Sequence, residues 1–330
     1  MGIGIWAAGL VALSLAAGGA SAEGLVVYNA QHESLAQEWA DAFTAETGIA
    51  VTLRQGSDLE MGNQLIQEGA NTPADVFLTE NSPAMVLVDA AGLFAPLPET
   101  VLAQVPAQFR PANGHWTGIA ARSTVFAYNT ERLGAAELPK TMAELAEPAW
   151  KGRWAASPSG ADFQAIVAAF LALKGEEATA AWLKGMAANV VTVRGNRTAM
   201  AAANRGEVDG ALIYHYYWFG DQAGTRESSD KVALHYFRGR DPGAFVSTSG
   251  AGVLAASKNR EAAMRFVEFL TGPGGQAVLR EGTSYEYAIG KGEASNPALV
   301  PLSELEAPEI DPSRLDNARA AALMTAAGLL

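Results

Sequence analysis

The sequence predicts an α/β protein built from two domains. Its 330 residues are about twice the length of a common single domain of ~150 residues. Apolar strand-like runs alternate with helical patterns along the chain. The composition, 49% hydrophobic and 18% charged, is typical of a folded protein and not of a disordered one. Each half is therefore long enough to bury its own core.

Three strand-like runs in the first half are each followed by a helical pattern. The runs lie at 25–28 (LVVY), 49–53 and 75–79 (DVFLT). Apolar residues recur at the spacing of one helical face, first at Leu35, Trp39 and Phe43, then at Met61, Leu65 and Ile66. Gly48 ends the first helix, and Ser82–Pro83 begins the third. This βαβαβα order is typical of a parallel sheet covered by helices.

The second half continues the alternation. We expect helices at 163–173, 176–188, 197–204 and 260–270, strands at 190–193, 211–214 and 231–237, and a further apolar segment at 250–255. Pro, Gly and polar residues are concentrated at 93–122, which is the favoured domain crossing, and a second crossing fits 242–249. The expected lobes are therefore discontinuous: an N-terminal lobe of 23–122 with about 247–290, and a C-terminal lobe of 123–246 with about 291–330.

The N-terminus has the pattern of a signal peptide. Residues 3–20 carry no charge and lead into Ala20-Ser21-Ala22, a small-x-small cleavage site, so residues 1–22 are expected to be removed. A single membrane anchor is the alternative, but the strongly apolar stretch from Ile3 to Ala17 is shorter than the ~20 residues that span a bilayer. The chain has no cysteine that could carry a lipid. The mature protein is therefore expected to be periplasmic, without direct membrane insertion.

Charge and motifs exclude several functions. The chain has 23 Lys and Arg against 35 Asp and Glu, a net charge of -12, which argues against nucleic acid as a partner. The lack of cysteine excludes disulfide scaffolds, zinc ribbons and thiolate catalysis. His32-Glu33 is followed by Ala36 where the zinc-protease motif needs His, and neither a P-loop nor a GxSxG elbow occurs. We therefore expect no enzyme, and a hinged solute receptor is favoured.

Polar side chains follow three of the strand-like runs. His32 comes after the first, Glu80 after the third, and the aromatic run Tyr214 to Phe219 after 211–213. In open α/β sheets ligands bind outside the carboxyl ends of strands, so these side chains are expected to share one cleft. Individually, His32 and Glu80 also fit a helix start or a solvated position, and the aromatic run also fits a core.

The donor types in this cleft suit a small, highly charged cation. A phenol ionises near pKa ~10, so two phenolates at neutral pH need a strongly polarising ion, and Fe(III) fits better than Zn(II). Adjacent strand residues point to opposite faces, so Tyr216 and Tyr217 reach one ion only if the chain bends. The sequence thus predicts a strand-to-helix junction at 214–218.

These residues resemble those of the periplasmic ferric-ion-binding protein family, the receptor component of ferric iron ABC transporters. The resemblance spans nearly the whole mature chain and rests on four segments: 27–32 (VYNAQH), 73–77 (PADVF) leading to Glu80, 211–213 leading to Tyr216-Tyr217-Trp218, and 240–244 (RDPGA). It implies a two-lobed, hinged periplasmic-binding-protein fold of type II-like architecture, with a mixed sheet flanked by helices in each lobe. It also implies a monomer that passes iron to an inner-membrane ABC permease, and Fe(III) held by His32, Glu80, Tyr216 and Tyr217.

The resemblance further implies an exogenous synergistic anion, phosphate or carbonate, on the opposing lobe. Ser159, Gly160, Ala161 and Asn196 match its contacts, although 159–161 also fits an ordinary helix cap. Tyr214 departs from the family, whose phosphate-using members carry Asn there, and it is expected to narrow the anion pocket, to bind a different anion or to reach the iron. Arg122 is expected to pair with an anion or with Glu80, and a structural salt bridge is the alternative.

Two other functions stay open. One is a hinged receptor for an organic or oxyanion solute, in which the tyrosines stack on the ligand. The other is a secreted hydrolase with no recognisable sequence motif.

Overall fold

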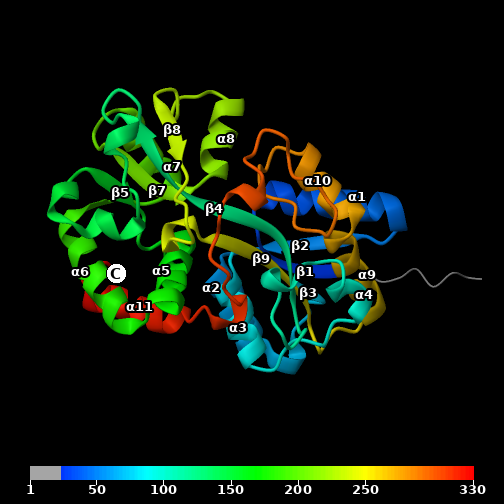
Figure 1. The fold of residues 1–330 in the computed structure, drawn as a ribbon. Helices are drawn as coiled ribbons and strands as arrows, with labels where there is room; N and C mark the ends of the chain where they lie inside the picture. The colour runs from blue at the N-terminus through cyan, green and yellow to red at the C-terminus, as the bar shows by residue number, and fades with distance from the viewer. Residues whose placement is uncertain (1–23) are drawn as a thin grey trace, which may run out of the picture.

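A computed structural model describes residues 24–330, and the predicted signal peptide at 1–22 lies outside this range. The chain forms two α/β lobes that are joined by two long neighbouring strands, β4 (Thr117–Asn129) and β9 (Val246–Val253) (Figure 1). The sheet order is β2-β1-β3-β9-β4-β7-β5-β6, with β8 paired to β4. The predicted two-lobed α/β class is confirmed.

The N-terminal lobe contains the three predicted parallel strands. These are β1 (Leu25–Ala30), β2 (Val51–Gln55) and β3 (Val76–Thr79), and β9 joins β3 in the antiparallel sense, so the sheet is mixed. Its helices are α1 (Glu33–Thr47), α2 (Asp58–Glu68), α3 (Ser82–Ala90), α4 (Glu99–Leu102), α9 (Arg260–Thr271) and α10 (Pro273–Glu281). Trp39 and Phe43, on the predicted apolar face of α1, are fully buried. Gly48 ends this helix with a φ of 74°, a left-handed conformation that glycine adopts without strain.

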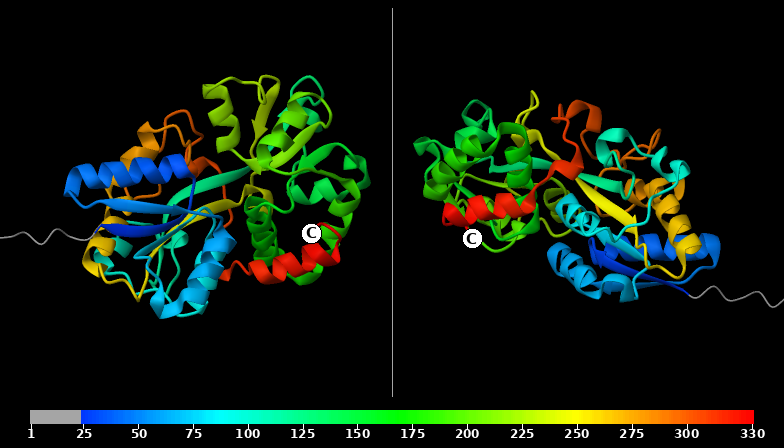
Figure 2. Two further views of the ribbon diagram at one scale, coloured as in Figure 1. Left: turned by 180° about the vertical axis from the view of Figure 1, so that it is seen from behind. Right: turned by 90° about the horizontal axis from the view of Figure 1, so that it is seen from below.

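The C-terminal lobe is built around the second part of β4. This part pairs with β7 (Gly210–Tyr214) and β8 (Val232–His235), and β7 continues in parallel through β5 (Trp154–Ala156) to β6 (Val190–Thr192). The helices are α5 (Ala161–Lys174), α6 (Glu176–Asn189), α7 (Asn196–Asn204), α8 (Tyr216–Ala223) and α11 (Asn317–Ala326). Figure 2 shows the C-terminal helix α11, in red, lying against α5 and α6. Between residues 24 and 330, no helix has the length and apolar character that crossing a membrane requires.

The connection between the lobes contains a long strand that the sequence analysis did not identify. Strand β4 pairs with β9 from Thr117 to Ser123 and with β7 from Thr124 onward, so one continuous strand passes from lobe to lobe. The first six residues of this strand, 117–122, lie within the stretch 93–122 that was favoured as the domain crossing. The segment expected at 250–255 is the end of β9. The predicted lobe limits stay a prediction. Leu299 and Leu305, which the prediction assigns to the C-terminal lobe, pack with Val105 and Phe109, which it assigns to the N-terminal lobe.

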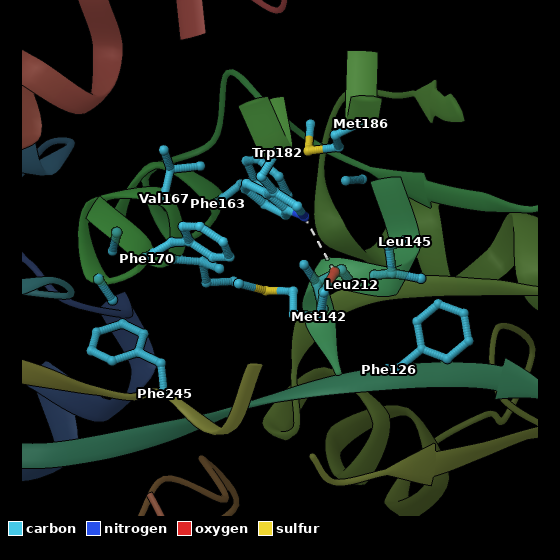
Figure 3. Close-up of a cluster of buried hydrophobic side chains, with 14 of the residues drawn as sticks. Phe126, Met142, Leu145, Phe163, Val167, Phe170, Trp182, Met186, Leu212 and Phe245 are labelled. Atoms are coloured by element: carbon cyan, nitrogen blue, oxygen red, sulfur yellow. Dashed lines mark hydrogen bonds between the residues drawn. The ribbon is translucent and has the colours of Figure 1, made fainter. Parts of the chain in front are cut away.

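A buried aromatic stack fixes α5 in the C-terminal lobe. The Trp182 indole stacks on Phe170, with 4.7 Å between ring centroids, and lies 6.5 Å from Phe163 (Figure 3). Its Nε1 donates a hydrogen bond to the Met142 carbonyl at 3.2 Å. Because Phe163 belongs to the first turn of α5, this stack holds the beginning of α5, next to the cleft, in place.

Trp182→Ala is expected to lower the free energy of unfolding by about 3–5 kcal/mol, because it opens a cavity and leaves the Met142 carbonyl without its donor. Urea unfolding followed by circular dichroism measures this loss. Trp182→Phe is the matched control, since it keeps an aromatic ring and removes the indole donor, and it should lose less than half as much. A loss below about 1 kcal/mol in Trp182→Ala would show that the stack does not hold the lobe together.

Candidate functional site

Three strand ends meet between the lobes. His32 follows β1, Glu80 follows β3, and Tyr216 begins α8 two residues after β7 ends at Tyr214. The predicted bend at 214–218 is thus confirmed. The His32 Nε2 atom lies 3.3 Å from Glu80 Oε1, and the Tyr216 hydroxyl donates a hydrogen bond to the same oxygen at 2.9 Å. Side chains from both lobes therefore meet at the Glu80 carboxylate.

The second tyrosine lies beside the first. The rings of Tyr216 and Tyr217 are 4.2 Å apart between centroids, because both belong to the first turn of α8. The Tyr217 hydroxyl donates to Asp162 Oδ2 at 3.1 Å and accepts from Asn196 Nδ2 at 3.2 Å. The Tyr216 hydroxyl lies 3.5 Å from Asp162 Oδ2. The structure thus brings the four predicted metal ligands together and adds Asp162, which sequence reasoning missed.

Arg122 neutralises part of the negative charge. Its guanidinium is fully buried, with Nη1 3.2 Å from Glu80 Oε1 and Nε 3.8 Å from Glu286 Oε2. It also lies 5.6 Å from the centre of the Tyr214 ring. Burial opposes its charge, but the carboxylates of Glu286, Glu80 and Asp162 outweigh burial and raise the Arg122 pKa. Of the partners predicted for Arg122, Glu80 is the one that it contacts.

Glu286 is a second carboxylate that sequence reasoning missed. It is fully buried and accepts from His32 Nδ1 at 3.1 Å and from Gln31 Nε2 at 3.2 Å. Burial opposes its charge, but Arg122 and the hydrogen bond from His32 lower its pKa. A hydrogen bond to Nδ1 fixes the imidazole tautomer and turns the Nε2 lone pair toward the cleft. Glu286 lies 254 residues from His32 and follows no predicted strand, so no sequence signal pointed to it.

The His32 ring is held between two carboxylates. Burial disfavours its cationic form, but the hydrogen bond to Glu286 and the charges of Glu80 and Glu286 outweigh burial and raise the pKa of His32. When Nδ1 donates to Glu286, the Nε2 lone pair faces Glu80 Oε1 at 3.3 Å. Two lone pairs at this distance repel each other, so the pair needs a proton or a metal cation between them.

Asp58 fixes the backbone that presents Glu80. Its carboxylate accepts from the Glu80 amide at 2.9 Å and from the Asn81 amide at 3.0 Å. Burial, followed by the charge of Glu80, raises the Asp58 pKa to about 8. For Asp162 the same two causes also raise the pKa. The site therefore concentrates carboxylates around one guanidinium.

Both cleft phenols are neutral without a cation. Burial, the charge of Asp162 and the charge of Glu80 raise the pKa values of Tyr216 and Tyr217 far above the usual range. Phenolate formation therefore requires a strongly polarising cation. Within residues 24–330, no group of three or more His, Cys, Asp or Glu side chains has the arrangement of a metal site, so a metal here would depend on the phenols.

A pocket at the C-terminal lobe contains the predicted anion residues. It is lined by Glu80, Ser157, Ser159, Gly160, Ala161, Asp162, Arg194, Gly195, Asn196 and Tyr217. Helices α5 and α7 begin here after glycines that supply no side-chain cap, so backbone N–H groups at two helix N-termini face the pocket. Asn196 already donates to Asp162 Oδ2 at 2.7 Å.

Tyr214 lies behind these groups. It is fully buried, and its hydroxyl is 3.4 Å from Asn81 Oδ1 and 3.3 Å from the Asp162 carbonyl oxygen. Tyr214 does not line the pocket. Its contacts connect Asn81 of the N-terminal lobe with Asp162 of the C-terminal lobe.

Comparisons with known proteins relate this chain to bacterial solute-binding proteins. The sequence model of the bacterial extracellular solute-binding protein family matches residues 71–308. The chain is 59% identical over 319 residues to the Fe(3+)-binding periplasmic protein of Serratia marcescens, covering 96% of this chain and 94% of that protein. It is 36% identical to the major ferric iron-binding protein of Neisseria meningitidis, with 97% of each chain covered. Among solved structures, iron-bound HitA from Pseudomonas aeruginosa is similar with a TM-score of 0.87 and 39% identity, covering 93% of this chain and 100% of that one.

Proposed function

The chain belongs to the bacterial extracellular solute-binding protein family, and we propose that it is a periplasmic Fe(III) receptor that delivers iron to an ABC-transporter permease. Its ferric-iron-binding relatives support this assignment. The observation that carries it is the donor set: an imidazole, a carboxylate and two phenols meet between the lobes, where each pair of neighbours needs a proton or a cation.

Fe(III) is held by His32, Glu80, Tyr216 and Tyr217. The two phenols lose their protons to solvent as the ion binds, so two phenolates and one carboxylate balance the three positive charges. Glu80 and the tyrosines come from different lobes, so the ion stabilises the closed arrangement of the lobes. Arg122 lies 3.8 Å from Glu286 and offsets the charge of this further carboxylate.

The other coordination positions are open to an anion. An exogenous phosphate or carbonate fits the pocket at Ser159, Gly160, Ala161 and Asn196, where two helix N-termini favour negative charge. A carboxylate of the chain itself is the alternative donor at these coordination positions. Tyr214 shapes this region through Asn81 and the Asp162 backbone and stays outside the ligand set.

The proposal also covers export, iron delivery, the oligomeric state and the lobe limits. The chain is exported by cleavage near Ala22, acts as a monomer, catalyses no reaction, and hands iron to its inner-membrane permease when the lobes open. The N-terminal lobe comprises 23–122 with about 247–290, and the C-terminal lobe comprises 123–246 with about 291–330.

Ligand-induced thermal stabilisation tests the assignment against other solutes. Fe(III), Zn(II), phosphate and a set of amino acids and sugars are each added to the metal-free mature chain. Because a ligand stabilises the state that binds it, Fe(III) should raise Tm strongly and the organic solutes should leave it unchanged. A rise in Tm with an organic solute and none with Fe(III) would replace the iron receptor with a receptor for that solute.

Glu286→Gln is expected to weaken Fe(III) binding by about 10–100-fold, because the carboxylate that orients His32 and increases its basicity is lost. The substitution keeps the size of the side chain, and the phenolate absorption should remain. Competition with a chelator measures the affinity. Glu281→Gln, on the exposed end of α10, is the control and should bind as the wild type does. If Glu286→Gln binds Fe(III) with the affinity of the wild type, Glu286 does not support iron binding.

A further inference from the structure

We propose that His215 is a positioning residue of the iron site: its imidazole fixes the beginning of α8, which carries both tyrosine ligands, to the strand β4 that joins the lobes. This inference rests on the proposed function and adds the residue that sets the direction in which Tyr216 and Tyr217 enter the cleft. Three features carry it: the place of His215 in the chain, the hydrogen bonds of its ring and backbone, and the aromatic rings around it.

His215 is the single residue between β7 and α8. Strand β7 ends at Tyr214, and α8 begins at Tyr216. The His215 backbone is already helical, with a φ of -59° and a ψ of -37°, and its carbonyl accepts from the Trp218 amide at 3.0 Å. The chain therefore turns from strand to helix at His215. Because adjacent strand residues point to opposite faces, this turn is what lets two consecutive tyrosines approach one ion.

The imidazole completes the hydrogen bonding of β4 at the point where this strand changes partner. Strand β4 pairs with β9 up to Ser123 and with β7 from Thr124, which lies opposite the last residue of β7. The Ser123 amide donates to His215 Nδ1 at 3.2 Å, and the His215 amide donates to the Ser123 carbonyl at 3.0 Å. Both residues are buried, so neither backbone group could turn to water instead. Two hydrogen bonds thus join the beginning of α8 to the strand that crosses between the lobes.

Only one of the two ring nitrogens of His215 has a partner. Because Nδ1 accepts a hydrogen bond, the ring is neutral and its proton lies on Nε2. The Nε2 atom is buried and has no hydrogen-bond partner in the described part of the chain. A buried N–H group without a partner costs free energy, and a phenylalanine ring would fill the space without that cost. The acceptor Nδ1 is therefore the property that distinguishes histidine at this position.

Aromatic rings fix the orientation of the imidazole. The His215 ring stacks on Tyr287, with 4.7 Å between centroids and 23° between the planes. The rings of Phe219 and Tyr216 approach it edge-on, at 6.0 and 6.3 Å between centroids. Since the His215 side chain is fully buried, these neighbours hold it where Nδ1 meets the Ser123 amide. The imidazole thus lies between β4 and the ring of one iron ligand.

Tyr287 connects the same imidazole to the other half of the site. Its backbone exchanges two hydrogen bonds with Ala121 of β4, at 2.8 and 3.1 Å. Tyr287 directly follows Glu286, which accepts from His32 Nδ1 at 3.1 Å. The segment that orients His32 and the segment that carries the tyrosines are therefore fixed to β4 two residues apart, with the His215 ring between them. A displaced imidazole would move the phenols relative to His32, and metal ligands bind tightly only when such supporting contacts hold them in place.

The test compares wild type, His215→Phe and His215→Asn. Phenylalanine keeps a ring for the stack but leaves the Ser123 amide without its acceptor, and it should weaken Fe(III) binding by about 10–100-fold. Asparagine places an amide oxygen where Nδ1 lies and is favoured directly before a helix, so it should recover most of the affinity. Chelator competition gives the affinities. The phenolate-to-iron absorption band should shift in His215→Phe and return toward that of the wild type in His215→Asn.

His235→Phe is the matched control. His235 lies on β8 of the same lobe, and its Nε2 donates to the Pro139 carbonyl at 2.8 Å, so this substitution also removes one hydrogen bond to the backbone. Neither residue lines the pocket beside Tyr217. The control should bind Fe(III) with the affinity and the absorption band of the wild type, although its Tm without metal should fall about as much as that of His215→Phe. The comparison separates a misplaced ligand from a general loss of stability.

Two results would overturn the inference and leave the iron receptor standing. One is a His215→Phe variant with the affinity and the absorption band of the wild type. The other is a folded His215→Asn variant that loses about tenfold or more of the affinity, because the hydrogen bond from Ser123 would then not be what positions the tyrosines. This second variant decides alone if circular dichroism shows that His215→Phe is unfolded. A wild type that develops no band with Fe(III), with or without phosphate or carbonate, would instead contradict the proposed function.

Discussion

Tyr216→Phe is expected to lower the affinity for Fe(III) by more than about 100-fold, the upper figure for groups that only support a metal ligand. The substitution removes one anionic donor and leaves the ring in place against His32 and Tyr217. Tyr217→Phe should have a similar effect. Chelator competition gives the affinity of each variant. The visible phenolate-to-iron absorbance should be weaker in each variant than in the wild type, because only one phenolate remains.

The matched control is Tyr128→Phe. Tyr128 belongs to β4 and packs against the core of the C-terminal lobe. Its substitution should leave iron affinity unchanged. The free energy of unfolding distinguishes a loss of iron affinity from a loss of stability. The Tyr216 hydroxyl donates one hydrogen bond to Glu80, so Tyr216→Phe should cost only about 1 kcal/mol of stability. If Tyr216→Phe and Tyr217→Phe bind iron like the wild type, the two phenols are not iron ligands and the proposed donor set is wrong.

Acidification is expected to release iron steeply. Burial and the neighbouring carboxylates keep the pKa values of Tyr216 and Tyr217 high in the metal-free state, so binding releases two phenol protons. Each released proton changes the affinity about tenfold per pH unit, so two give about 100-fold per unit near neutrality. The pKa of His32 is also raised, and below it a third proton must leave before iron binds. The affinity should therefore fall faster still in mildly acidic solution.

Affinity measured from about pH 8 to about pH 5 against a chelator of known protonation tests this dependence. His32→Gln is the informative variant: it should bind more weakly throughout and lack the additional steepness at low pH, while the phenol contribution remains. An affinity that stays constant over this range would rule out tyrosinate ligands.

Much of the site could be predicted because three of its residues follow strands with clear patterns. The runs before His32, Glu80 and Tyr216 are apolar and β-rich, and the carboxyl ends of such strands face the cleft. Adjacent tyrosines on one ion require a bend, and β7 indeed gives way to α8 at that point.

The parts that were missed depend on tertiary contacts. Strand β4 consists largely of small and polar residues, so its first half read as a connection, and pairing with β9 is what makes that half a strand. Glu286 belongs to no strand end and meets His32 only because β9 brings the chain back to the N-terminal lobe. Asp162 lies next to the predicted anion segment but resembled an ordinary first-turn acidic residue, and its role depends on where Asn81, Asn196 and Tyr217 lie.

The most direct measurement is a ferric titration of the mature chain, residues 23–330, followed by visible absorbance. The account predicts a saturable phenolate-to-iron charge-transfer band that is complete at one equivalent of Fe(III) and absent from the Tyr216→Phe/Tyr217→Phe double variant. A folded wild-type chain that develops no such band, with or without phosphate or carbonate, would contradict the assignment of an Fe(III) receptor.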